Sequence, residues 1–133
     1  MRSILPIAAV CAAISLFLAA PALARPVKVS VSTVTVTAGK PQEFHFIVAP
    51  ATVKSGIVVF NVTNKGALAH DFSICSAPST SLANSCRGRT TKQISPGKSD
   101  TLRVTITRKG TYEYLCTVPG HAAGGMKGFI KVT

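Results

Sequence analysis

The strongest constraint on the fold of this chain is a series of short segments with strand character, each closed by turn residues. In residues 101–107 apolar side chains alternate with Thr and Arg, whereas residues 56–63 form a nearly continuous apolar run. Alternation is typical of a strand with one face on a core, and a continuous run is typical of a strand buried on both faces. No segment has a convincing helical period, so the pattern predicts an all-β fold.

Further segments of the same character bring the expected total to seven or eight strands: residues 27–37, 44–48, 71–74, 112–116 and 128–132. The alternation of the first of these slips near Ser32, which predicts a bulge or a bend. Residues 78–99 are rich in Ser, Thr and Asn, and we expect them to be mostly loop. Strands of this number and spacing predict a two-sheet sandwich or barrel, in a chain whose length suits one domain.

The first 24 residues have the composition of a secretory signal peptide. A positive start is followed by an apolar run over residues 4–20, of about the length of a signal core, and then by small residues. We predict cleavage after Ala24, with Ala22 as the alternative, which leaves residues 25–133 as the mature domain. The protein is then expected to be periplasmic or secreted, with no stable membrane insertion.

The chain has 4 cysteines, and export makes their pairing informative. Cys11 falls in the apolar start, where a lipoprotein signal is the alternative reading, although the residues before it match a lipobox poorly. Cys75 and Cys86 are separated by ten residues across a loop rich in Ser, and we predict that they form a disulfide. Cys116 is then the odd thiol. In the alternative, Cys75 joins a multi-thiolate site for Cu(I) or zinc.

The odd thiol lies beside two other metal-binding residue types. Cys116, His121 and Met126 fall within one eleven-residue segment after a predicted strand, and His70 follows a turn far upstream. Any one of them alone would more often be a core or surface residue, but together they match a known donor set. Two imidazoles, one thiolate and a weak axial thioether suit copper in an electron-transfer site.

In the segments that carry these residues, the sequence resembles the cupredoxins, the type 1 blue copper proteins that include plastocyanin, azurin, auracyanin and rusticyanin. Residues 110–121, with residues 125–128 behind them, look like the C-terminal copper loop of that family, and residues 56–64 followed by residues 70–72 look like its upstream half. The Cys-to-His and His-to-Met spacings are similar to those of rusticyanin and auracyanin. The resemblance implies a Greek-key sandwich with copper near one end and four ligands, the equatorial His70, Cys116 and His121 and the axial Met126.

Two residues near the expected ligands need separate comment. Many cupredoxins have Asn after the first His, where this chain has Asp71. The resemblance implies that Asp71 ties the two ligand loops together, but a carboxylate would also lower the copper potential unless it is paired or protonated. His45 alternates with Phe44 and Phe46, so we expect it to face solvent and assign it no ligand role.

The expected function is that of an exported one-electron carrier, which cycles one copper ion between Cu(II) and Cu(I). The alternative is a copper-binding or delivery protein, in which copper is cargo. The carrier is favoured because the donors come from two distant segments and should be buried, whereas delivery sites expose theirs. An enzyme is not expected, because protein donors fill all four positions and leave none open for a substrate.

The charge of the chain bears on its partners. Lys and Arg number 15 against 4 Asp and Glu, a net charge of +11, and the basic residues are dispersed without interleaved aromatics. This argues against nucleic acid. The charge either steers acidic-faced redox proteins or serves solubility alone. We expect a monomer with an apolar docking patch of small residues around His121: Gly120, Ala122, Ala123 and Gly124, with Ala67, Leu68 and Ala69.

Overall fold

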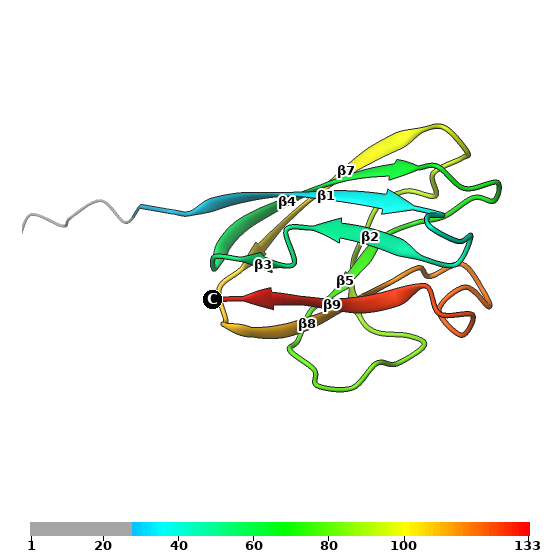
Figure 1. Ribbon diagram of the computed structural model, residues 1–133. Helices are drawn as coiled ribbons and strands as arrows, with labels where there is room; N and C mark the ends of the chain where they lie inside the picture. The colour runs from blue at the N-terminus through cyan, green and yellow to red at the C-terminus, as the bar shows by residue number, and fades with distance from the viewer. Residues whose placement is uncertain (1–27) are drawn as a thin grey trace, which may run out of the picture.

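Two β-sheets pack face to face in the computed structural model, which describes residues 28–133 (Figure 1). These residues form nine strands and no helix, so none of their segments is a helix that could cross a membrane. The all-β prediction is confirmed. The signal peptide predicted over residues 1–24 lies outside the described residues.

The first sheet has four strands in the order β2-β1-β4-β7. Their bounds are β1 Val31–Ala38, β2 Phe46–Ala49, β4 Gly56–Asn64 and β7 Ser99–Ile106. β1 runs parallel to β4, and the other neighbours in this sheet are antiparallel. The apolar run over residues 56–63 becomes a central strand, hydrogen-bonded on both edges. The prediction that both of its faces are buried is wrong, because Val58, Phe60 and Val62 are buried whereas Asn61 on the other face is exposed.

The second sheet has five strands in the order β3-β9-β8-β5-β6. Their bounds are β3 Thr52–Val53, β5 Ser73–Cys75, β6 Gly88–Thr90, β8 Gly110–Leu115 and β9 Lys127–Val132. β3 is parallel to β9, and the remaining pairs are antiparallel.

The core lies between the two sheets and is formed by the inward side chains of the alternating strands. In β7 the buried residues are Leu102, Val104 and Ile106, as the alternation predicts. Phe60 and Phe72 are fully buried, with ring centroids 5.0 Å apart. Burying a side chain of this size contributes about 1.5–3 kcal/mol to folding, so alternation is the main determinant of which face each strand turns inward.

Two predictions about the strands are wrong. The expected bulge near Ser32 is absent, because β1 pairs residue for residue with β4 from Val31 opposite Ile57 to Ala38 opposite Asn64. The expected total of seven or eight strands omitted β3 and also β6, which lies in the segment expected to be loop. β3 has two residues, and the three residues of β6 are all exposed, so neither carries an apolar pattern.

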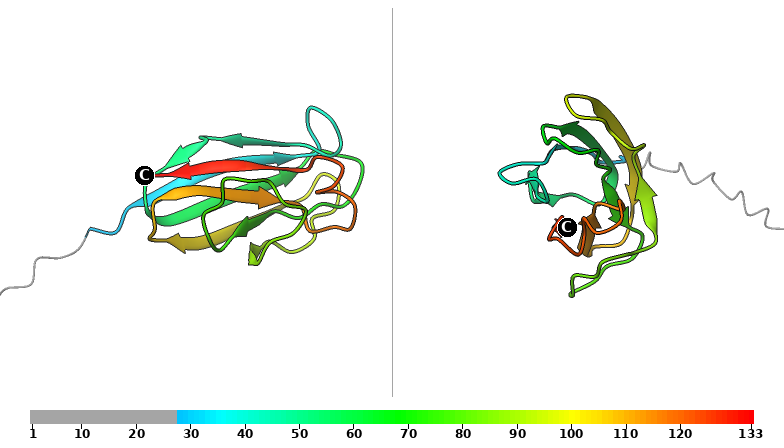
Figure 2. Two further views of the ribbon diagram at one scale, coloured as in Figure 1. Left: turned by 90° about the horizontal axis from the view of Figure 1, so that it is seen from below. Right: turned by 90° about the vertical axis from the view of Figure 1, so that its right-hand side faces the viewer.

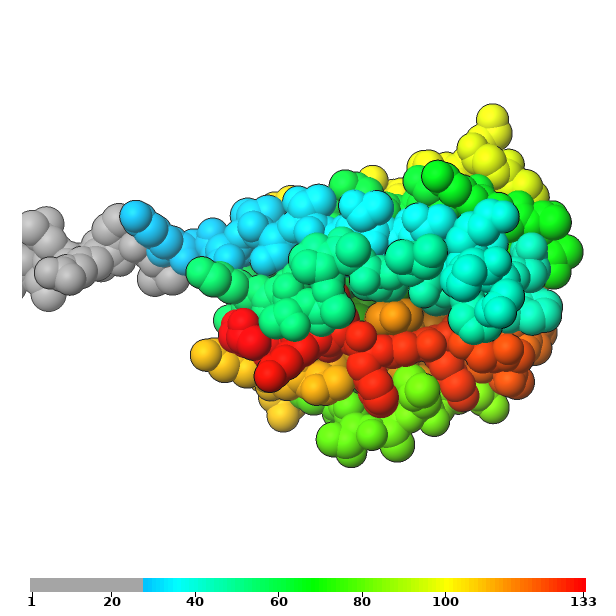
Figure 3. All heavy atoms as spheres, in the orientation of Figure 1, coloured from blue at the N-terminus to red at the C-terminus, as the bar shows by residue number. Residues whose placement is uncertain are grey.

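Three connections meet at one end of the sandwich, the end opposite the C-terminus (Figures 1 and 2). They are the β1–β2 loop, the segment that follows β4, and the loop between β8 and β9. In the space-filling view the atoms of the β1–β2 loop lie next to those of the β8–β9 loop (Figure 3). The sheets thereby bring together residues that are distant in the sequence.

Candidate metal centre

Three donor atoms converge at the loop end of the sandwich. They come from His70 before β5, and from Cys116 and His121 in the β8–β9 loop, and all lie within 4.8 Å of one another. The two Nδ1 atoms are 3.1 Å apart, and the sulfur of Cys116 is 3.5 Å from Nδ1 of His121. All three residues are buried, so the structure brings together the three equatorial residues that the sequence predicted.

His70 is fixed by backbone pairing with a distant segment. Its backbone N–H donates to the carbonyl of Ile94, and the N–H of Ile94 donates back to the carbonyl of His70. The buried side chain of Asn64 holds the same region together, because its Nδ2 donates to the carbonyls of Leu68 and Ile94. Its Oδ1 also accepts from the N–H of Gly66. These contacts fix the backbone that carries the His70 ring.

Glu43, from the β1–β2 loop, is a residue that the sequence analysis missed. Its Oε1 lies 2.8 Å from Nε2 of His70, and its carboxylate accepts hydrogen bonds from the backbone N–H groups of Ala67 and Leu68. These backbone donors, helped by the hydrogen bond from His70, lower the pKa of Glu43 from 4.5 to about 2. The sequence gives no local signal of this contact, since Glu43 lies in a polar turn 27 residues before His70.

The β8–β9 loop is closed mainly by its own hydrogen bonds. The backbone N–H of Cys116 donates to the carbonyl of Met126, and that of Met126 donates to the carbonyl of His121. The N–H of His121 donates in turn to the carbonyl of Val118. Met126 is fully buried and packs in one cluster with Cys116 and Ala38. The fourth expected ligand, Met126, therefore packs in the same buried cluster as Cys116.

Asp71 connects the two ligand segments, as the resemblance implied. Its Oδ1 accepts from the backbone N–H of Thr117 at 2.6 Å, and its Oδ2 accepts from the hydroxyl of the same residue. Since Asp71 follows His70 and Thr117 follows Cys116, these bonds fix the spacing between the two ligands. The Asp71 carboxylate is thus held by two neutral donors, and its negative charge still acts on Cys116 and His121, because it contributes to raising the pKa of both groups.

The electrostatics of the cluster fit a bound cation. Burial is the main reason that the pKa of the Cys116 thiol is raised to about 11, although backbone N–H groups of Asp71 and Val118 donate toward its sulfur. Burial, and secondly the neighbouring His70, lower the pKa of His121. The Nδ1 atoms of the two imidazoles lie 3.1 Å apart, beside a buried thiol. A soft cation held by these donors would stabilise the thiolate, and His₂Cys with a nearby Met suits copper.

Cys75, Cys86 and His45 lie outside this cluster. Cys75 and Cys86 form the predicted disulfide, and Cys116 is free. The alternative, in which Cys75 joins a multi-thiolate site, is therefore wrong. His45 is exposed, as predicted.

The apolar patch expected around His121 is only partly present. Gly120, Ala123 and Gly124 are exposed, but Ala122 is buried with 4% of its surface accessible. His121 itself is 7% exposed, and its ring packs against Phe44 with centroids 4.9 Å apart. The patch is therefore smaller than predicted, because Ala122 turns inward in the tight loop.

Comparisons with known proteins agree with the donor set. The sequence profile described as copper binding proteins, plastocyanin/azurin family, matches residues 32–133. Auracyanin-B of Chloroflexus aurantiacus is 42% identical over 43 residues, which make up 32% of this chain. The match spans 18% of the length of that protein.

Solved structures show the same fold. A structure of auracyanin B superposes with a TM-score of 0.62 at 22% identity, over 82% of this chain and 93% of the other. Reduced rusticyanin superposes with a TM-score of 0.55 at 28% identity, over 77% of this chain and 79% of the other. The arrangement of sheets described above is thus found in blue copper proteins.

Proposed function

The chain belongs to the plastocyanin/azurin family of copper-binding proteins, and from that premise we propose that it is an exported electron carrier with four copper ligands. The protein binds one copper ion and transfers one electron at a time. The observation that carries this conclusion is the convergence of His70, Cys116 and His121 within 4.8 Å at a buried point. Bound copper supplies the Cu(II)/Cu(I) couple.

Each ligand is proposed from its place in the site. His70 and His121 offer Nδ1, and Cys116 offers a thiolate. Met126, buried in the cluster with Cys116, is proposed as the weak axial donor. With these positions filled by protein there is no position for a substrate, so we propose a carrier rather than an enzyme.

The hydrogen bonds around the ligands favour fast electron transfer. Asp71 joins the two ligand segments, the β8–β9 loop closes on itself, and the backbone of His70 is paired with Ile94. A donor set held in this way changes little between the two oxidation states, so little reorganisation opposes the transfer. This preformed arrangement distinguishes a carrier from a delivery protein, which must open to release its metal.

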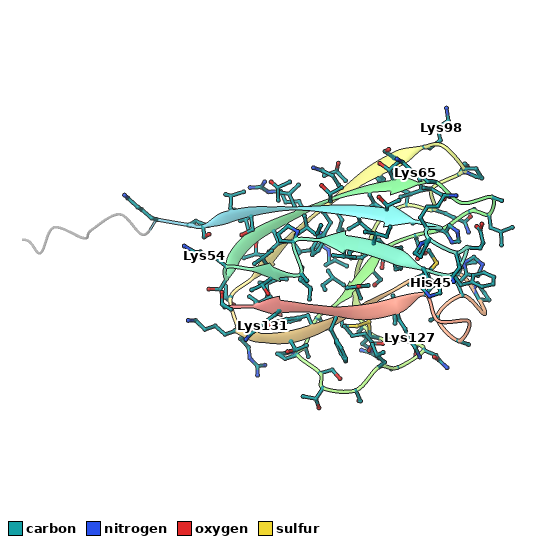
Figure 4. All side chains as sticks on the ribbon, viewed as in Figure 1. His45, Lys54, Lys65, Lys98, Lys127 and Lys131 are labelled. Atoms are coloured by element: carbon teal, nitrogen blue, oxygen red, sulfur yellow. A yellow bond between two sulfur atoms is a disulfide. The ribbon has the colours of Figure 1, made fainter. Side chains whose placement is uncertain are left out.

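We propose acidic-faced redox proteins as the partners. Leu68 is 46% exposed in the segment before His70, and the exposed glycines next to His121 leave a small uncharged surface over the site. Lys65 and Lys98 lie toward this end, whereas Lys54 and Lys131 lie toward the opposite end (Figure 4). Positive charge beside an uncharged contact surface would speed encounter with an anionic partner and make the rate depend on ionic strength.

Export is supported by two observations. The predicted signal peptide is the first, and the Cys75–Cys86 disulfide is the second, since disulfides form and persist in oxidising compartments. We therefore propose that the protein is periplasmic or secreted. Separately, we propose that it functions as a monomer.

The test is to load the mature chain with Cu(II), record its visible spectrum and measure its voltammetry. An intense blue thiolate-to-copper band with a reversible one-electron wave supports the carrier. A colourless protein that gives up its copper to a mild chelator contradicts it and favours copper as cargo. Partner charge is tested separately, by the ionic-strength dependence of electron exchange with an anionic and a cationic inorganic redox probe.

A further inference from the structure

The His70 ring has two nitrogens, and the structure gives each a different neighbour. Nδ1 lies 3.1 Å from Nδ1 of His121, and Nε2 lies 2.8 Å from Oε1 of Glu43. The side chain of His70 is fully buried, while that of Glu43 is 30% exposed. The ring therefore lies between the metal centre and a carboxylate from the β1–β2 loop.

We propose that Glu43 is a positioning residue for the copper site. Its carboxylate holds the His70 ring so that the ring proton is on Nε2 and the lone pair of Nδ1 points toward Cys116 and His121. The inference rests on the copper site proposed above. An ionised carboxylate can only accept hydrogen bonds, so contact with Glu43 requires a proton on Nε2. In a neutral ring this leaves Nδ1 unprotonated, as a metal ligand must be.

The carboxylate of Glu43 is itself held in place. It accepts hydrogen bonds from the backbone N–H groups of Ala67 and Leu68, in the segment that leads into His70. It therefore contacts both the ligand ring and the backbone that carries it. Rotation of the His70 ring would break its hydrogen bond to Glu43, while the carboxylate would stay bonded to the backbone N–H groups of Ala67 and Leu68.

The absence of a side chain at Gly66 leaves room for this pair. A Cβ built on Gly66 would lie 2.5 Å from Oε1 of Glu43 and 3.0 Å from Nε2 of His70. Both distances are too short for ordinary contact, so even alanine would push the carboxylate and the ring apart. The loop is thus shaped around the contact between Glu43 and His70.

A carboxylate behind a ligand imidazole also has an electrostatic consequence. Its negative charge raises the basicity of the ring and stabilises Cu(II) more than Cu(I). Asp71 carries the other carboxylate near the ligands, but its oxygens are bound to Thr117 rather than to an imidazole. Glu43 therefore acts on copper through His70, whereas Asp71 ties the two loops together and places its charge near Cys116 and His121.

The experiment compares wild-type protein with Glu43→Gln, which keeps an acceptor oxygen but removes the charge, and Glu43→Ala, which removes both. Glu113→Gln is the matched control, since Glu113 is a buried carboxylate on β8 that accepts a backbone N–H from Ala83. The first readout is the His70 ring in the metal-free chain, observed by ¹⁵N-correlated NMR. The second is the pair of dissociation constants for Cu(II) and Cu(I), with the reduction potential.

In wild type and Glu113→Gln, we expect a proton on Nε2 of His70 that exchanges slowly with solvent. In Glu43→Ala this proton should exchange rapidly and its resonance should shift or disappear. Both Glu43 variants should bind Cu(II) about 10–100-fold more weakly, the usual effect of losing such a partner. Cu(I) binding should weaken less, so the potential should rise.

A proton on Nδ1 of His70 in wild type, or an unchanged Nε2–H resonance in Glu43→Ala, would overturn the proposal. So would a Glu43→Gln variant that is less stable than wild type but keeps its potential and both dissociation constants, because Glu43 would then only tie the loops. The NMR readout uses no copper. A wild type that shows the Nε2–H contact but forms no blue copper complex would therefore contradict the proposed function and leave the positioning of His70 intact.

Discussion

Cys116, His121 and Met126 share one eleven-residue loop whose main hydrogen bonds close within that loop, whereas the segment around His70 is held by residues from elsewhere in the chain. Glu43 comes from the β1–β2 loop and Ile94 from the segment before β7. One half of the centre is therefore a local structure, and the other half is assembled by the fold.

The difference shows which half of the site depends on the stability of the whole domain. The β8–β9 loop keeps its three donors close in sequence, so small changes elsewhere leave their spacing almost unchanged. His70 keeps its position only while distant segments stay packed against it. Substitutions that affect one half and not the other test this comparison.

The largest effect on the copper site is expected in the β8–β9 loop, from removing the sulfur of Cys116. Cys116→Ser should abolish the blue absorption entirely, because that absorption arises from the thiolate bound to Cu(II). Ser nearly matches the shape of Cys, so the fold should be kept, as far-ultraviolet circular dichroism would verify. A Cys116→Ser variant that stayed blue would rule out Cys116 as the ligand.

The next largest effect is expected in the segment around His70, from the substitution Asn64→Ala. The substitution leaves the carbonyls of Leu68 and Ile94 and the N–H of Gly66 without their partner. We expect the free energy of unfolding to fall by about 3–4 kcal/mol, with weaker copper binding. Chemical denaturation and chelator competition measure the two effects.

Asn61 on the same strand is the matched control, because it is exposed and its side chain accepts one hydrogen bond, from the hydroxyl of Thr101. Asn61→Ala should lower the free energy of unfolding by about 0.5 kcal/mol or less. Equal losses in the free energy of unfolding from Asn64→Ala and Asn61→Ala would contradict the stabilising role of the buried Asn64 side chain.

A somewhat smaller loss of stability, without any change at copper, is expected when the disulfide is removed. The double substitution Cys75→Ser and Cys86→Ser opens a loop with a sequence separation of 11. Chain entropy predicts a loss of about 3 kcal/mol in the free energy of unfolding. The visible spectrum should be unchanged, since neither cysteine belongs to the donor cluster. A loss of the blue band in a variant that is still folded would link this loop to the metal centre.

A smaller effect on stability than that of removing the disulfide is expected from Met126→Leu. The two side chains have similar volumes, so the free energy of unfolding should change by less than about 1.5 kcal/mol. The blue colour should remain, because the thiolate is still bound. The reduction potential should rise, since Cu(II) loses more than Cu(I) when a weak axial donor is removed. An unchanged potential would show that Met126 is not a ligand.

The sequence predicted most of the segments that form strands. In residues 101–107 apolar and polar side chains alternate because the two faces of a strand differ, and residues 56–63 are mostly apolar because they form a central strand. β3 and β6 were not predictable, since strands of two and three residues have too few side chains to show a period. The prediction of a bulge near Ser32 was wrong for a different reason, because it was based on a slip in the side-chain alternation, which the backbone pairing does not follow. The backbone ladder between β1 and β4 continues through the irregular sequence there.

The sequence by itself determined the donor types and the local loop, because Cys116, His121 and Met126 are close enough for their spacing to identify them. It also determined the odd thiol, once Cys75 and Cys86 were paired. Only the tertiary structure decided that Glu43 contacts the Nε2 of His70 and that Ala122 turns inward. Contacts between residues far apart in the chain depend on how the sheets bring loops together, and no short-range pattern in the sequence encodes that distance.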